Sequence, residues 1–467
     1  MFLHSPSFVF VFCPLVVAVY AVLWRLGLTT GRRVFLLVAS IAFYALAGLP
    51  GLPVLAASVV LNYFVARRVT PASPSPRRWL VFGIVANVTL LAAFKYTAFV
   101  VANLAAVSGS TWEPPRLVLP LGISFFSVAQ IIYLMDCYEE LTTPAPLLDH
   151  ALFGSFFPTI TAGPITRGSE LIPQLESAAP TADGAAAGVV LFVFGLTKKV
   201  VVADTFGRLV DFQFSSAQRL GLVDGWATAF SYAMQLYYDF SGYSDMAIAV
   251  GLMLGLRLPV NFNAPFRALS VVDFWKRWHI SLSTFITTYL YTPLARRFRP
   301  LTFPKAMAVT VVSMAIAGLW HGPAWTYIVF GVVHGAGMVA SHVWRRRKLP
   351  MPRAAGWALT LVFVVAAFVV FRAADLAEAR AMFAAMLGLH GLRGPSPSLA
   401  FPRFEWFHAI PIMAIGALAA LVGPTSSDLV ARFKPSKRWV VGCSVAILVC
   451  VLFMNTSATK GFIYRGF

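Results

Sequence analysis

Long apolar stretches separated by short polar segments make up most of the chain. A helix needs about 20 mostly apolar residues to cross the hydrocarbon core of a membrane. Eleven stretches approach or exceed that length. We therefore expect membrane helices at 6–24, 33–48, 52–66, 79–106, 186–204, 226–256, 306–321, 324–343, 355–371, 408–423 and 438–454.

Two further apolar stretches, 117–138 and 151–165, are interrupted by proline and glycine and are expected to be short, tilted or re-entrant. The pattern predicts an all-α polytopic membrane protein with about 11–13 transmembrane or re-entrant helices, forming one domain over residues 1–467. The first run, 8–23, has no basic segment before it and no small-residue cleavage site. We expect it to be a transmembrane helix rather than a signal peptide.

Composition excludes a soluble protein of this length, since 59% of the residues are hydrophobic, only 12% are charged and the mean hydropathy is +0.76. The net charge of +19 arises from basic residues clustered between apolar runs. Such clusters indicate cytoplasmic loops, and they argue against nucleic acid as a partner. The cluster Arg345–Lys348 is expected in the cytoplasm, which places 261–300 on the cytoplasmic side and His321 near the outer end of its helix.

Residues 232–293 are more polar than the other apolar stretches. Asp239, Ser241, Tyr243 and Asp245 fall within a predicted membrane helix, where polar side chains are costly unless they satisfy one another or line a polar tunnel. Asp239 and Asp245 are six residues apart and do not share a helix face closely, which disfavours a paired-carboxylate metal or glycosidase site. We therefore predict a central polar tunnel lined by these four residues and Trp320, without a metal ion.

A cytoplasmic segment rich in aromatic and basic residues follows. Its aromatic side chains suit the depth of lipid headgroups, and its cations suit phosphates. Two interpretations remain open: an aromatic belt in contact with membrane lipids, or a portal for an anionic cofactor. In the second, the ligand-binding residues are Arg267, Trp275, Lys276 and Arg277.

His321 lies between two apolar stretches, in the run Gly318-Leu-Trp320-His321-Gly322-Pro323. Ionisable side chains at membrane depth usually line a functional cavity, although a neutral histidine bonded to its neighbours is the alternative. The flanking glycines and tryptophans, and a second polar cluster around His279, favour function. The chain has no Walker A, GxGxxG, HExxH or GxSxG motif, which disfavours nucleotide hydrolysis, zincin and serine hydrolase chemistry.

The chain resembles the membrane-bound O-acyltransferase (MBOAT) family, and specifically its bacterial alginate O-acetyltransferase-like branch. The resemblance covers nearly the whole chain and rests on motifs in sequence order: Met1-Phe-Leu-His-Ser5-Pro6-Ser-Phe8, Leu119-Pro120-Leu-Gly122-Ile-Ser124-Phe-Phe126, Ala162-Gly163-Pro164-Ile165, Asp239-Phe-Ser241-Gly242-Tyr243-Ser244-Asp245, Asp273-Phe274-Trp275-Lys276-Arg277-Trp278-His279-Ile-Ser281-Leu-Ser283, Gly318-Leu-Trp320-His321-Gly322 and Phe371-Arg372-Ala373. The ending Phe462-Ile463-Tyr464 is also similar, but Arg465 and Gly466 depart from the aromatic-rich tail of the branch.

This resemblance implies acyl transfer from a thioester donor to a hydroxyl, with the two family histidines falling on His321 and His279. We expect His321 to be the general base or a transient acyl carrier, and His279 to orient the donor side or relay protons. Acetyl-CoA is then a substrate received from the cytoplasm, and no tightly bound cofactor is expected.

The resemblance also implies an exported polysaccharide such as alginate as acceptor, separate periplasmic acetyltransferases as partners, and a bacterial inner-membrane location. Transfer of D-alanyl or another acyl group to a cell-wall polymer is one alternative. A transporter is another, but it predicts an internal repeat, which the sequence lacks.

Overall fold

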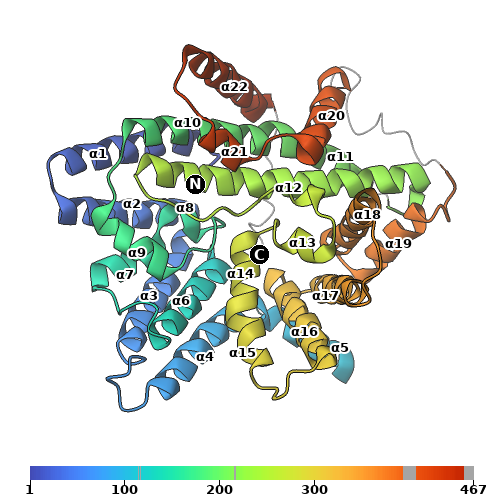
Figure 1. Ribbon diagram of the computed structural model, residues 1–467, viewed down its shortest axis with the longest axis horizontal. Helices are drawn as coiled ribbons and strands as arrows, with labels where there is room; N and C mark the ends of the chain where they lie inside the picture. Colours follow the sequence, from blue (N-terminus) through green and yellow to red (C-terminus); the bar gives the residue numbers. More distant parts are fainter. Residues whose placement is uncertain (114, 116, 215–216, 393–405, 457–467) are drawn as a thin grey trace.

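The computed structural model describes residues 1–467 except 114, 116, 215–216, 393–405 and 457–467 (Figure 1). The described residues form helices, turns and loops, with no strand among them. The prediction of an all-α membrane protein is thereby confirmed. The motif expected at Phe462–Tyr464 lies outside the described residues.

Eight helical runs in the described part of the chain are long and apolar enough to cross a membrane. They are Phe8–Arg25, Thr29–Ala66, Pro76–Lys95, Ala182–Phe214, Phe303–His321, Trp325–Arg346, Arg353–Arg372 and Lys437–Met454. Three shorter apolar helices accompany them: Thr97–Ser108, Ile123–Tyr138 and Phe407–Val422. The chain is a multi-pass membrane protein.

Eight such runs are found where 11–13 helices were expected, because several of the expected stretches are joined, too polar or too short. Stretches 33–48 and 52–66 form two helices, but a short 3-10 turn, η2 (Leu49–Gly51), joins them into one run. Stretch 226–256 is helical but too polar to count as an apolar run. Stretch 151–165 contains only two short helices.

The first part of the chain contains α1 (Cys13–Arg25), α2 (Thr29–Gly48), α3 (Leu52–Ala66), α4 (Pro76–Lys95), α5 (Thr97–Ser108), α6 (Ile123–Tyr138), α7 (Leu147–Ser155), α8 (Phe157–Ile160) and α9 (Gly168–Ser177). Helices α1 to α4 lie on one side of the molecule, whereas α5 lies on the other side and packs against Trp325 (Figure 1). A π-helical segment, η1 (Phe8–Phe12), precedes α1.

The second half contains the longest helix and the elements around it. They are α10 (Ala182–Thr197), η3 (Lys198–Ala203), α11 (Asp204–Phe214), η4 (Ala217–Arg219), α12 (Leu222–Met253), η5 (Pro265–Arg267), α13 (Val271–Trp275), α14 (Ile280–Phe285), η6 (Ile286–Tyr291), α15 (Thr292–Ala295), α16 (Phe303–His321), α17 (Trp325–Arg346), α18 (Arg353–Arg372), α19 (Leu376–Met386), α20 (Trp406–Val422), α21 (Ser426–Ala431) and α22 (Lys437–Thr456).

Helix α12 crosses the middle of the molecule, with α10 and α11 alongside it (Figure 1). The two backbones approach closely where glycines face each other: a Cβ on Gly195 would lie 2.7 Å from the carbonyl oxygen of Gly242, and a Cβ on Gly242 would lie 2.6 Å from that of Gly195. Helix α12 continues unbroken through Gly242. This glycine permits the close packing typical of membrane helices.

Two buried ion pairs join α12 to the π-helical segment η3. Lys198 Nζ lies 2.7 Å from Asp245 Oδ2, and Lys199 Nζ lies 2.7 Å from Asp239 Oδ1 and 2.8 Å from Asp204 Oδ1. All five side chains are buried. Lys198 and Lys199 are consecutive, and Asp239 and Asp245 are six residues apart. Each aspartate is therefore paired with its own lysine, and the two carboxylates do not form a shared site.

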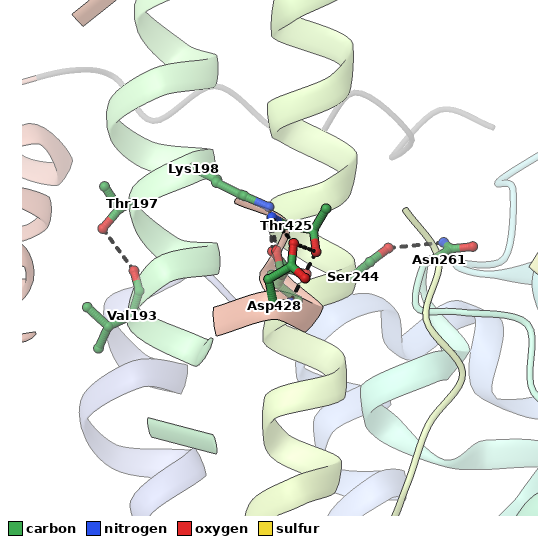
Figure 2. A network of polar contacts seen from close by, with 9 residues as sticks. Val193, Thr197, Lys198, Ser244, Asn261, Thr425 and Asp428 are labelled. Carbon is green, nitrogen blue, oxygen red and sulfur yellow. Dashed lines mark hydrogen bonds and ion pairs between the residues drawn. The ribbon is translucent and has the colours of Figure 1, made fainter. Parts of the chain in front are cut away.

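Polar contacts attach α21 and the end of α20 to this central layer, and Figure 2 shows those around Lys198, Thr425 and Asp428. Lys198 Nζ donates to Ser426 Oγ at 2.8 Å, and that hydroxyl donates to Asp245 Oδ2 at 2.6 Å. Thr425 and Asp428 form a capping box at the same turn of α21. Arg267 Nε donates to the Leu421 carbonyl at 3.0 Å, and its Nη2 donates to the carbonyl of Gly423.

Helices α16 and α17 cross in close contact at positions occupied by glycine. A Cβ on Gly331 would lie 2.2 Å from the Met314 carbonyl oxygen, and a Cβ on Gly318 would lie 2.1 Å from that of Tyr327. Such positions tolerate no side chain without a shift of the two backbones. The crossing fixes the end of α16, where His321 lies.

We predict that Gly331→Ala lowers the thermal unfolding midpoint by several degrees, because the added methyl group overlaps a backbone carbonyl at a cost of about 1–3 kcal/mol. Thermal unfolding of the purified protein in nanodiscs measures this. Gly442→Ala in α22 is the matched control, since a Cβ there would meet nothing within 4 Å. Equal midpoints for the two variants would contradict the tight crossing.

Candidate functional site

His279 is carried into the interior by a return of the chain after α12. The Ile280 N–H donates to the Asn261 carbonyl and the Asn263 N–H donates to the Arg277 carbonyl, both at 2.9 Å. His279 precedes the first turn of α14 with a left-handed backbone conformation, φ +43°. This conformation is uncommon for a residue other than glycine and is often found at functional sites. The side chain is fully buried.

The side chain of Asn261 determines which nitrogen of His279 carries the proton. Its Oδ1 accepts the Ser281 N–H at 3.2 Å and the Ser281 hydroxyl at 2.9 Å, while its Nδ2 donates to Ser244 Oγ at 3.1 Å (Figure 2). His279 Nδ1 lies 3.1 Å from the same Oδ1 and must therefore be the donor. In the neutral ring Nε2 is then unprotonated, and no described residue donates to it.

His321 is the last residue of α16, and Gly322 continues in an extended conformation. Aromatic rings enclose the imidazole, with ring centroids 5.0 Å away for Trp320, 5.2 Å for Phe371 and 6.3 Å for Phe330. Only 3% of the residue is exposed. The enclosure excludes bulk water from the ring.

The end of α16 has free backbone carbonyls, as every helix end does, and α4 and its following residue satisfy two of them. Lys95 Nζ donates to the Trp320 carbonyl at 2.5 Å, and Tyr96 Oη donates to the Leu319 carbonyl at 2.6 Å. Lys95 also donates to Ser124 Oγ at 3.0 Å. These bonds connect α4 and α6 to the turn that carries His321.

The structure brings the two histidines together. The Trp320 ring lies between them, 6.3 Å from the ring of His279 and 5.0 Å from that of His321. His321 is close enough to His279, Lys95 and His334 for charge interactions with each. Residues expected to approach the membrane from opposite faces thus converge in a buried site.

A cavity of about 270 Å³ lies between η6, α16 and α17. Its lining is mainly apolar and includes Trp275, Met307, Met314 and Met338. Trp275 Nε1 donates to His334 Nδ1 at 3.1 Å, which connects the cavity wall to a histidine near His321. Trp275 is one of the four residues predicted to bind a phosphate-bearing cofactor, and it lines this cavity.

The three basic residues predicted beside Trp275 have different surroundings. Lys276 is exposed, and its side chain has no hydrogen bond or ion pair with a described residue. Arg277 Nε lies 2.9 Å from Asp273 Oδ1, and the pair is partly exposed. Arg267 holds the end of α20, so its guanidinium is already engaged. A role in phosphate binding stays a prediction for all three.

Four of the predicted tunnel residues are buried and Trp320 is partly buried, but they make separate contacts. Asp239 and Asp245 are ion-paired to Lys199 and Lys198. The Tyr243 hydroxyl is hydrogen-bonded to that of Thr161. Ser241 Oγ is buried without a hydrogen-bond partner among the described residues. Only Trp320 lies between the histidines, and the tunnel itself stays a prediction.

Three residues near the histidines were missed by reasoning from the sequence: Lys95, Asn261 and His334. Lys95 had a usable signal, since a single lysine within the apolar stretch 79–106 is costly in a membrane. His334 had the same signal, since it is an ionisable residue within the apolar stretch 324–343. Asn261 had none, because its role depends on residues that the folded chain brings to it. The described residues contain no group of three or more His, Cys, Asp or Glu placed to hold a metal ion.

A second, larger groove of about 960 Å³ lies at the end of α11, against η4 and α19. Its lining includes Phe214, Arg219 and Arg380. The guanidinium of Arg372 stacks over the Phe214 ring at 4.9 Å, and the residue before it, Phe371, packs against His321. Two consecutive residues, Phe371 and Arg372, thus connect the surroundings of His321 to the wall of the groove.

Comparisons with known proteins bear on this site. A sequence model of the MBOAT, membrane-bound O-acyltransferase, family matches residues 84–377, a range that contains both histidines and Lys95. The peptidoglycan O-acetyltransferase of Helicobacter pylori is 39% identical over 425 residues, covering 83% of this chain and 80% of that protein. The probable alginate O-acetylase of Azotobacter vinelandii is 38% identical over 397 residues, covering 83% and 78%. The teichoic acid D-alanyltransferase of Streptococcus thermophilus is 28% identical over 251 residues, covering 49% and 58%.

We predict that Asn261→Leu destabilises the protein by about 1–3 kcal/mol, because buried donors on His279 and Ser281 lose their acceptor. Thermal unfolding in nanodiscs checks this. Ser244→Ala is the control: it removes only the partner of the Asn261 amide nitrogen, and a smaller loss is expected. A larger loss for Ser244→Ala would overturn the role assigned to Asn261.

Proposed function

Because the chain belongs to the membrane-bound O-acyltransferase family and is therefore an O-acyltransferase, we propose that it transfers acetyl groups from cytoplasmic acetyl-CoA for O-acetylation of an exported polysaccharide. Acetyl transfer is favoured over D-alanyl transfer by the extent of similarity. The acetylating relatives match 83% of the chain at 36–39% identity, whereas the D-alanylating ones match 49–54% at 27–28%. Alginate and peptidoglycan are both acceptors named among those relatives.

The observation that carries the proposal is the pair of buried imidazoles on either side of Trp320. A hydroxyl must lose its proton as it attacks a thioester carbonyl, and an imidazole is suited to accept that proton. In our proposal His321 is the general base. His279, with Nδ1–H held by Asn261 and Nε2 unprotonated, orients the donor side or passes protons.

The donor enters from the cytoplasmic side through the cavity at Trp275. Its apolar, methionine-rich lining suits the flexible arm that carries the thioester. Lys276, the exposed residue that follows Trp275 in the chain, is available to the phosphates of acetyl-CoA. Acetyl-CoA is thus a substrate of the reaction and not a resident cofactor.

The acceptor side opens outward through the groove at α11 and α19. In a bacterial inner membrane this side faces the periplasm, where we propose that a separate acetyltransferase partner receives or guides the acetyl group to the polymer. The whole chain works as one domain in this scheme. Direct D-alanyl transfer is the second candidate, supported by the D-alanylating relatives.

We predict that His321→Ala abolishes turnover of radiolabelled acetyl-CoA by the purified protein in nanodiscs, a loss of at least about 100-fold, since a general base contributes about 10²–10⁴-fold. His408→Ala in α20 is the matched control, because this histidine is exposed and lies outside the site. Retention of CoA binding by the His321 variant shows that the fold survives. Equal turnover by the two variants would remove His321 from the chemistry.

If wild-type protein turns over D-alanyl carrier protein but not acetyl-CoA, the second candidate function replaces the first.

We predict that Lys276→Ala raises the KM for acetyl-CoA several-fold and leaves kcat unchanged, because a phosphate contact binds substrate and transition state equally. Steady-state kinetics over a range of acetyl-CoA concentrations measure both constants. Lys434→Ala, at another exposed lysine, is the control and should change neither. A fall in kcat alone would place Lys276 elsewhere in the mechanism.

A further inference from the structure

Lys95 is a buried cation with no carboxylate partner among the described residues. It ends α4, a membrane-spanning helix, and 5% of its surface is exposed. The other buried lysines, Lys198 and Lys199, each pair with aspartate. A lone ammonium at membrane depth is costly and by default marks a functional site. The mechanism proposed above assigns Lys95 no role.

The hydrogen bonds of Lys95 leave one donor unused. An ammonium has three N–H groups, and the described residues accept two: the Trp320 carbonyl at 2.5 Å and Ser124 Oγ at 3.0 Å. Nζ lies 5.8 Å from the centroid of the Trp320 ring, the ring that separates the two histidines. The unused donor is therefore held within the histidine site by two fixed contacts.

We propose that Lys95 is a catalytic residue that stabilises the oxyanion of the acyl-transfer intermediate. The inference rests on the proposed function. As the acceptor hydroxyl loses its proton to the imidazole, its oxygen bonds to the thioester carbonyl carbon and the carbonyl oxygen becomes negative. The third N–H of Lys95 donates to this oxygen. The intermediate collapses, the C–S bond breaks, and the imidazolium proton goes to the departing thiolate.

A purely structural role does not account for the charge. Tyr96 satisfies the neighbouring carbonyl of the same helix end with a neutral hydroxyl, at lower desolvation cost than a buried ammonium. A cation beside His321 also opposes the positive charge that a general base acquires. The oxyanion that forms in the same step carries a negative charge, which offsets the positive charges on the imidazolium and the ammonium. The ammonium therefore stabilises the transition state rather than the ground state.

The test compares acetyl transfer by Lys95→Met and Lys95→Gln with that by Lys95→Arg and Tyr96→Phe. Loss of one oxyanion donor costs about 10²–10³-fold in kcat, so kcat for Met and Gln should fall at least about 100-fold with KM for acetyl-CoA unchanged. Lys95→Arg keeps the charge and should recover much of that loss. Tyr96→Phe removes a bond to the same helix end and should change kcat by only a few-fold.

Thermal unfolding and CoA binding of each variant separate catalysis from folding. Lys95→Gln keeps an N–H donor for the Trp320 carbonyl, so it covers the case in which Lys95→Met does not fold. Near wild-type kcat for a folded Gln or Met variant overturns the proposal, as does an equal loss for Tyr96→Phe. Absence of acetyl-CoA turnover by the wild type would instead reject the proposed function itself.

Discussion

A charge inside a membrane must find its partner inside the protein, and the arrangement of this chain depends on that constraint. Lys198 and Lys199 are consecutive, and they reach Asp245 and Asp239 on the neighbouring helix. Because unpaired members of these pairs would be uncompensated in hydrocarbon, the register of α10 and η3 against α12 is defined within one residue. The glycine contacts at Gly195 and Gly242 permit the approach that these short bonds require. The pair Lys198–Asp245 also hydrogen-bonds Ser426 of α21, so this helix is attached where the two charges are neutralised.

The site lies where helices end, and the physics of helix ends explains why. A membrane helix satisfies its backbone internally except in its last turn, so the end of α16 needs donors from elsewhere. Lys95 and Tyr96 supply them. The start of α14 is built similarly, through the backbone and side chain of Asn261. Polar groups recruited to satisfy two interrupted helices are thereby concentrated around Trp320, and both histidines project into that region.

The sequence predicted the helical membrane architecture and singled out both histidines, because apolar length and isolated polar residues are local properties of the chain. Their convergence was not predictable: it depends on the return of the chain at Asn261 and on the α16–α17 crossing at Gly331, which join segments far apart in sequence. Arg267 was predicted to bind phosphate from its basic surroundings, and this stays a prediction; its contact with α20 could not be foreseen, because it joins residues far apart in sequence. For Lys95 the sequence did contain a local signal, a lysine within an apolar stretch. Its place in the site could be recognised only from its hydrogen bond to the Trp320 carbonyl.

The proposed acyl transfer from a thioester also requires that water be kept from the donor, since hydrolysis competes with attack by the acceptor. The burial of His279 and His321 among aromatic rings provides that exclusion. In our proposal the two substrates use separate openings: a mainly apolar cavity at Trp275 and a groove with charged residues in its wall. The proposal assigns the flexible acyl arm to the cavity and a polymer or a protein partner to the groove. The enclosure of the histidines then favours attack by the acceptor hydroxyl over attack by water.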